Sequence, residues 1–209
     1  MKNKNLLIAI VLMFFAQVSI GQTIVGSAHD FSDDSWNTTG EICIVCHTPH
    51  NADMTVTNAP LWNHQVTGVT NFQLYTSSTF NGISTIGQPD ESSKLCLSCH
   101  DGTVALENFG TMTTGVNYIQ GIYNLGTDLR DDHPISFTYD VNLVTQDGEL
   151  FDPLTTTVPE LGGTIDAKML FNHKLQCASC HDVHNSSGEN FLLLFSNNVS
   201  NLCLTCHNK

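Results

Sequence analysis

Hydrophobic and polar positions are distributed very unevenly along the chain. Lys2 and Lys4 precede an apolar run from Leu6 to Ala16, and Ser19-Ile20-Gly21 then supplies small residues at the spacing of a cleavage site. The run is shorter than the roughly 20 residues that cross a bilayer. A basic start, a short apolar centre and small residues at the exit are typical of a secretory signal peptide. We therefore predict a cleaved signal peptide at 1–21 and a secreted mature chain, with a retained membrane anchor as the alternative.

The rest of the chain has weak periodicity. Long stretches rich in Thr, Ser, Asn and Gly separate short apolar groups, of which FLLLF at 191–195 is the longest. Ile135, Phe137 and Tyr139 alternate as in a half-buried strand. The turn-like sequence TQDG at 145–148 then leads into another short apolar segment. We predict a small β-hairpin in this region.

The chain is acidic, with a formal net charge of −13. Loss of Lys2 and Lys4 with the signal peptide would change this to about −15. Such a charge argues against nucleic acid and anionic membrane surfaces as partners. Solubility is the simplest role of the charge, and cations or basic proteins are the partners that it would attract.

All eight cysteines fall in one motif, CxxCH, which occurs four times. The copies are Cys43-Ile-Val-Cys46-His47, Cys96-Leu-Ser-Cys99-His100, Cys177-Ala-Ser-Cys180-His181 and Cys203-Leu-Thr-Cys206-His207. Disulfide scaffolds and zinc sites also use regularly spaced cysteines, but neither requires a histidine after every second cysteine. Covalent attachment of haem c does require it, because two thiols on one helical turn bond to the porphyrin and the histidine binds its iron. We therefore predict four covalently bound haem c groups, attached through these eight cysteines and ligated by His47, His100, His181 and His207.

Four porphyrins would supply much of the buried apolar surface in a chain of this length, which accounts for the weak periodicity elsewhere. The predicted fold is mostly irregular coil with short α-helices at the haem-attachment sites and a small β-hairpin, in the class of the multihaem cytochromes c. We expect the polypeptide to be poorly ordered without haem.

The four motifs form an internal repeat. The first and third read CxxCHxxHN, whereas the second and fourth lie in the similar octets SKLCLSCH at 93–100 and SNLCLTCH at 200–207. Ser and Asn at the start of each octet favour a short helix, and Asp101-Gly102 can end the first one. We predict two dihaem modules at 22–107 and 171–209, joined by a connecting segment at 108–170 that contains the DHP sequence.

Each iron needs a second axial ligand. Six histidines remain outside the motifs, namely His29, His50, His64, His133, His173 and His184, in competition with Met54, Met112 and Met169. The surplus of histidines favours bis-histidine ligation at all four sites. An iron with both axial positions filled has no place for a substrate, so this ligation favours electron transfer over catalysis.

The second histidine of each CxxCHxxHN motif cannot reach the opposite face of its own haem, because His50 and His184 project from the same turn as His47 and His181. We predict that each binds the iron of the neighbouring haem in its module. A hydrogen bond to a haem propionate is the alternative.

The other predicted ligands come from the segments between the motifs. Pro134 biases His133 toward an extended backbone that can present its imidazole to an iron. His64 and His29 are also predicted ligands. His173 is the weakest candidate, because it has no counterpart before the first motif.

Several runs extend beyond the motifs themselves: SAHDFS, GEICIVCHTPHNA, APLWNH, QPDESSKLCLSCHDGTVAL, DHPISFTYD, CASCHDVHN and SNLCLTCH. Together they resemble the extracellular tetrahaem c-type cytochromes with paired CxxCH motifs, the family of outer-membrane cytochrome E of microbial nanowire filaments. The resemblance extends from Ser27 to His207. His173 departs from the family pattern, in which a small residue is expected.

The resemblance implies a row of closely spaced bis-histidine haems and a head-to-tail homopolymer in which one haem takes its distal histidine from the neighbouring subunit. It also implies redox partner cytochromes or extracellular electron acceptors as partners. His29 lies on a short N-terminal arm, and only Asn208 and Lys209 follow the last motif. We therefore expect a neighbouring protomer to cover the fourth haem.

The predicted function is long-range electron transfer by a tetrahaem c-type cytochrome in an extracellular filament. A soluble periplasmic electron shuttle is the alternative, followed by a multihaem reductase.

Overall fold

The computed structural model describes residues 24–209, and the predicted signal peptide lies outside these residues. Its α-helices are α2 (Glu91–His100), α3 (Val141–Asp147), α4 (Ile165–Met169) and α5 (Asn201–Cys206). Single 3-10 turns are η1 (Cys43–Val45), η2 (Asn81–Ser84), η3 (Gly121–Tyr123), η4 (Cys177–Ser179), η5 (Asn190–Leu192) and η6 (Asn198–Ser200). The strands are β1 (Phe137–Thr138), β2 (Thr157–Val158), β3 (Gly163–Thr164) and β4 (Lys174–Leu175). The predicted class is confirmed, since short helices and small sheets are joined by long coil.

Two antiparallel pairs of strands make up the sheet structure. In one pair, Phe137 lies opposite Leu175 and Thr138 opposite Lys174. In the other, Thr157 pairs with Thr164 across a short connection. The strand predicted around Phe137 therefore exists, but its partner comes from just before the third motif.

The hairpin predicted after TQDG is wrong, because residues 141–147 form helix α3. The side chain of Asp140 caps its N-terminus by accepting a hydrogen bond from the Leu143 amide at 2.9 Å. Gly148 ends it with a left-handed backbone, φ 76°. The sequence read as a hairpin turn is thus the end of a helix, and the compact β2–β3 hairpin lies a few residues later.

The largest apolar cluster joins all three parts of the chain. It contains Phe137, Tyr139, Leu143, Val158, Ile165, Met169, Leu175, Phe195 and Leu202, with Phe80 packed against it. The Phe80 and Phe137 rings meet edge to face, with centres 5.3 Å apart. The segment before the second motif is thereby packed on the connecting segment.

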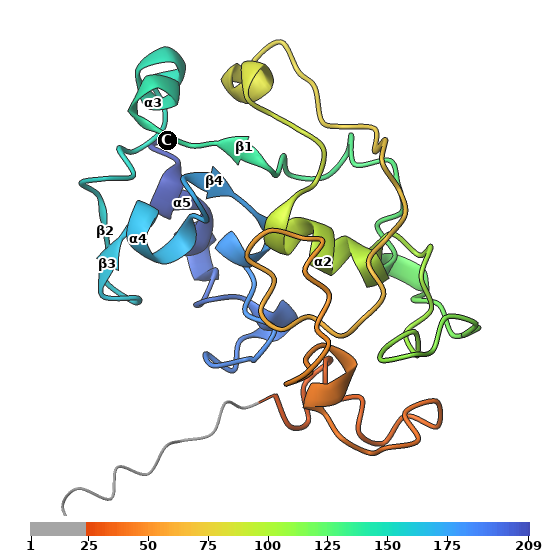
Figure 1. Cartoon of the computed structure of the whole chain (residues 1–209). Coiled ribbons are helices and arrows are strands. Elements are labelled where there is room, and N and C mark those ends of the chain that lie inside the picture. The colour runs from red at the N-terminus through yellow and green to blue at the C-terminus, as the bar shows by residue number, and fades with distance from the viewer. Residues whose placement is uncertain (1–23) are drawn as a thin grey trace, which may run out of the picture.

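Two smaller clusters lie against α2. Val56, Trp62 and Leu95 form one, and Phe72, Leu97 and Leu129 form the other. Figure 1 shows α2 near the middle of the molecule, with α4 and α5 to one side. Among residues 24–209, no helix has the length and apolar character needed to cross a bilayer.

Candidate haem-attachment sites

Each CxxCH motif occupies a single helical turn. The first and third motifs begin in η1 and η4, whereas the second and fourth end α2 and α5. The turn is closed by a backbone hydrogen bond from the motif histidine to its first cysteine, as from His47 to Cys43 at 2.8 Å and from His181 to Cys177 at 3.1 Å. This closure brings two thiols and one imidazole of each motif onto the same turn.

The second thiol of every motif is kept uncharged by burial. Burial raises the pKa of Cys46 and of Cys180 to about 11, and that of Cys99 and of Cys206 to about 12. An uncharged thioether suits such a site, whereas zinc would need thiolates. Within residues 24–209, no group of three or more Cys, His, Asp or Glu is arranged to hold a metal ion.

Three of the motif histidines have one ring nitrogen engaged by the backbone. The Nδ1 atoms of His47, His100 and His181 lie 2.6, 2.7 and 2.9 Å from the carbonyl oxygens of Pro60, Tyr123 and Phe191. A protonated Nδ1 donates to such a carbonyl, which leaves Nε2 as the free nitrogen. A histidine that binds a metal is commonly oriented in this way.

Three motif histidines also face a histidine from elsewhere in the chain. The ring centres of His47 and His184 are 6.1 Å apart, those of His100 and His29 are 6.2 Å apart, and those of His207 and His133 are 6.4 Å apart. The first pair is stacked at 16°, and the other two are steeply inclined. Each pair combines one CxxCH histidine with one predicted distal histidine.

These separations fit an iron between the two rings. A metal–imidazole bond is about 2 Å long, so nitrogens on opposite sides of one metal lie about 4 Å apart and the ring centres somewhat farther. Burial, with His100 nearby, lowers the pKa of His29 to about 4. His29 is therefore neutral near pH 7, which is the form that binds a metal.

The partner of His184 differs from the expected one. We expected it to face His207 of its own module, but its ring faces His47 of the first motif. The Asp182 carboxylate accepts a hydrogen bond from the His184 backbone amide at 2.9 Å and lies 3.7 Å from the Nδ1 atom of His184. The two CxxCHxxHN motifs are thus brought together by the fold, which sequence spacing does not reveal.

His50, the counterpart of His184, is exposed. Among the described residues, no histidine ring is paired with His181, so the third motif is the one without a facing histidine. We had expected a neighbouring protomer to cover the fourth haem, and within one chain His133 lies beside His207 there.

The structure places His64 apart from these pairs. His64 is 1% exposed, and its two ring nitrogens lie 2.9 and 3.1 Å from the carbonyl oxygens of Gln65 and Ala105. Its Nε2 is also 3.6 Å from the Cys99 sulfur. His64 is therefore buried beside the second motif with both ring nitrogens near carbonyl oxygens, and its role as an iron ligand stays a prediction.

The surroundings of His173 differ from those of the motif histidines. Its Nδ1 is 2.6 Å from the Asp166 carboxylate, and its side chain is mostly exposed. Both residues line a cavity of about 290 Å³ that Tyr139 and Asp140 also border.

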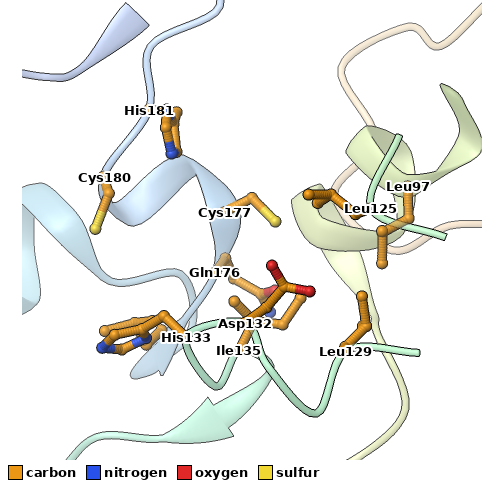
Figure 2. A pocket seen from close by; sticks show the side chains of 11 residues that line it. Leu97, Leu125, Leu129, Asp132, His133, Ile135, Gln176, Cys177, Cys180 and His181 are labelled. Atoms are coloured by element: carbon orange, nitrogen blue, oxygen red, sulfur yellow. The ribbon is translucent and has the colours of Figure 1, made fainter. Parts of the chain in front are cut away.

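A second cavity lies against the third motif. It measures about 230 Å³ and is lined by Cys177, Cys180 and His181 together with Leu97, Leu125, Leu129, Ile135, Leu175, Asp132, His133 and Gln176. Figure 2 shows Leu97 and Leu125 across the cavity from the motif, with the carboxylate of Asp132 between them and His133. The apolar wall is the kind of surface that covers a porphyrin face.

Neighbouring motifs also approach one another through their cysteines. Burial and then Cys46 raise the pKa of Cys99, and burial and then Cys180 raise that of Cys206. The pKa of the Cys96 thiol is raised, and that of the Cys177 thiol lowered, chiefly by the contact between the two side chains. Consecutive motifs therefore adjoin one another, and the first also adjoins the third through His47 and His184.

Sequence reasoning missed the groups that orient the motif histidines. The carbonyls of Pro60, Tyr123 and Phe191 leave no signal, because every residue has one. Asp182 did have a signal, since an acidic residue two positions before a histidine can accept from its Nδ1.

A scan of protein families matches residues 171–209 to the doubled CXXCH motif. These residues contain the third and fourth motifs. No curated protein matches the chain.

The doubled motif indicates covalent haem c binding and electron transfer, and such haem attachment typically takes place outside the cytoplasm. The facing histidines and the apolar cavity fit that cofactor. The match and the geometry together support a multihaem c-type cytochrome-like protein.

Proposed function

We propose that the chain binds four haem c groups and passes electrons along them. The observation that carries this proposal is the placement of three CxxCH histidines opposite three other histidines, with ring centres 6.1–6.4 Å apart. Three such pairs need a common cause, and a shared metal between the rings supplies one.

The residues that would hold the haems are assigned from the motifs and the pairs. Covalent attachment uses Cys43, Cys46, Cys96, Cys99, Cys177, Cys180, Cys203 and Cys206, and the axial pairs are His47 with His184, His100 with His29, and His207 with His133. When bound, haem supplies one-electron iron chemistry. The backbone carbonyls that engage Nδ1 hold each imidazole in orientation.

Paired histidines favour electron transfer over a reductase. An iron with two imidazoles has no open position for a substrate. The adjacency of consecutive motifs through their cysteines supports a continuous row of haems, which is what transfer over a long distance requires.

The test is the haem content and spin state of the purified protein. Mass spectrometry should give a chain mass increased by four haems, and electron paramagnetic resonance should show low-spin ferric iron. Fewer than four haems, or a dominant high-spin signal that responds to cyanide, would count against the proposal and favour a reductase.

We further propose that the protein assembles with copies of itself as an extracellular filament. The ring of His184 lies beside His47 of the first motif, whereas His50 of the first motif is exposed and His181 is without a facing ring among the described residues. The reciprocal contact, His50 of one copy to His181 of the next, would complete the third site. The resemblance to filament cytochromes supports the same arrangement, in which a partner cytochrome or extracellular acceptor would exchange electrons with the filament.

A pair of variants tests this assembly. His50→Ala should abolish filaments in electron micrographs and give one high-spin haem per chain. His173→Ala, the matched change at another exposed histidine, should leave both unchanged. A wild-type protein that stays monomeric with four low-spin haems would favour the periplasmic shuttle, and loss of filaments in His173→Ala alone would assign the contact to His173.

A further inference from the structure

A buried polar network lies where the second and third motifs meet. Ser93 is 0% exposed, and Ser136 and Gln176 are each 1% exposed. They come from the start of α2, from the segment before β1 and from the residue before η4. Three distant parts of the chain therefore bring polar side chains to one dry place.

Gln176 is the centre of the network. Its Oε1 accepts hydrogen bonds from the hydroxyls of Ser93 and Ser136, the latter at 3.0 Å. Its Nε2 donates to the Asp90 carboxylate at 2.7 Å, and Lys174 pairs with the other oxygen of that carboxylate. The buried amide thus has partners at both ends, as a polar group removed from water requires.

The network reaches the haem-attachment residues directly. The Cys177 amide donates to the Ser93 hydroxyl at 2.9 Å. Ser93 lies one helical turn before Cys96 in α2, and the Cys96 and Cys177 side chains lie close enough to shift each other's pKa. The first cysteines of the second and third motifs are therefore joined by side chains outside both motifs.

Directional bonding matters here because apolar packing alone would permit small shifts. Hydrogen bonds fix distance and angle together, and a fully satisfied buried network rigidifies its surroundings. An apolar contact of the same size could hold α2 against η4 without fixing how far one lies along the other.

We propose that Gln176, with Ser93 and Ser136, is a positioning device that sets the separation of the second and third haem-attachment motifs. The proposal rests on the proposed function, because the separation matters only when both motifs carry haem. The network would thereby determine how closely the two dihaem modules are coupled.

The test compares two serines of α2 in the haem-loaded protein. Ser93→Ala removes the bond to Gln176 and the acceptor of the Cys177 amide. Ser92→Ala is the matched control, because Ser92 is the neighbouring serine of α2, lies outside the motif, and has a hydroxyl without a hydrogen-bond partner among the described residues. The readouts are haem content, Soret circular dichroism, which reports the relative placement of haems, and amide hydrogen exchange.

With full haem content, Ser93→Ala should alter the Soret couplet and speed exchange of the Cys177 amide by about threefold to tenfold, the worth of one hydrogen bond. Ser92→Ala should leave both as in the wild type. An unchanged couplet in Ser93→Ala, or an equal change in both variants, overturns the proposal.

If Ser93→Ala does not accumulate, Ser136→Ala carries the test alone, because it removes one donor to Gln176 and an acceptor of the Asp90 amide but leaves the bond from the Cys177 amide to Ser93 in place. A changed couplet then supports the proposal, and an unchanged one overturns it. A wild-type protein without haem would instead refute the proposed function, so the two failures are distinguishable.

Discussion

At the scale of single residues, three of the four motif histidines are prepared for a metal by the group that engages their Nδ1 atom. A carbonyl serves His47, His100 and His181. The distal histidines are less uniform, since His184 has the Asp182 carboxylate, and His133 Nδ1 lies 2.9 Å from the Pro134 carbonyl. Differences of this kind alter the basicity of a ligand and hence the potential of its iron.

The identity of a distal ligand should be measurable as a redox potential. His133→Met would place a thioether opposite His207, and methionine ligation raises the potential. We expect one of four potentials to rise by on the order of 100 mV, within the roughly 0.8 V range that axial ligands cover. Spectroelectrochemical titration measures this. His173→Met is the control, and a shift there as large as in His133→Met would contradict the assignment.

Glu107 provides a pH-dependent contact away from the motifs. Burial opposes its ionisation, but bonds from the Val116 amide at 2.6 Å and the Asn117 amide at 3.1 Å lower its pKa below 4.5. A carboxyl whose pKa is lowered in the folded protein stabilises the fold at pH values above its pKa in the unfolded chain. That contribution is lost as the pH falls through the lowered pKa. Exchange protection at Val116 and Asn117 should therefore decrease as pH drops below about 4.5.

Glu107→Gln removes the titrating group, so protection of these amides should become independent of pH in that range. The exposed Glu41→Gln serves as the control. Wild-type protection that does not change with pH would contradict the role of Glu107.

At the scale of elements, α3 shows how end signals define a short helix. The Asp140 cap and the left-handed Gly148 bound seven residues whose only buried side chain is Leu143. Because packing contributes little, the cap should matter. Asp140→Ala should destabilise the protein by about 1 kcal/mol, measured by denaturant unfolding. Asp131→Ala, at an exposed aspartate, should cost less than about 0.5 kcal/mol, and equal costs would disprove the capping role.

The same helix shows which local features sequence reasoning could recover. TQDG suits a hairpin turn and a helix end equally, and only the Asp140 signal eight residues before Gly148 favours the helix. The helix at the second motif was predicted, and it ends at Asp101-Gly102 as expected. Its N-terminal cap position is Asp90 and not the expected serine.

The contacts between distant segments of the site were harder to predict from the sequence. The CxxCH residues follow from the local requirements of haem attachment, and His133 and His29 were recognised as distal candidates. The pairing of His184 with His47 depends on how two distant segments pack, so spacing along the chain could not predict it. The network at Gln176 was missed for the same reason, since its partners lie 40 to 86 positions away.

At the scale of the whole molecule, the three apolar clusters are small and separate, and the third motif lies among them. Its cavity is bordered by Leu97 of α2, by Leu125 and Leu129 of the connecting segment, and by Leu175 of β4. The first motif has fewer such neighbours, since Cys46 packs only against the cluster of Val56, Trp62 and Leu95. The four attachment sites should therefore contribute unequally to stability.

Removing attachment at one motif at a time tests this inequality. The double change Cys177→Ser and Cys180→Ser would leave the cavity at the third motif without a covering haem face. Of its leucines, Leu125 is the one that is 40% exposed, and an exposed leucine costs roughly 1.5–3 kcal/mol. We expect this variant to be less stable than Cys43→Ser with Cys46→Ser by about 3 kcal/mol, or roughly 5–10 °C in melting temperature. Calorimetry of both variants, each shown to have lost a single haem, measures the difference. If the apolar side chains around the third motif depend on the third haem for cover, then losing that haem must destabilise the protein more than losing the first haem. Equal losses of stability would therefore mean that the apolar clusters hold the fold without the third haem.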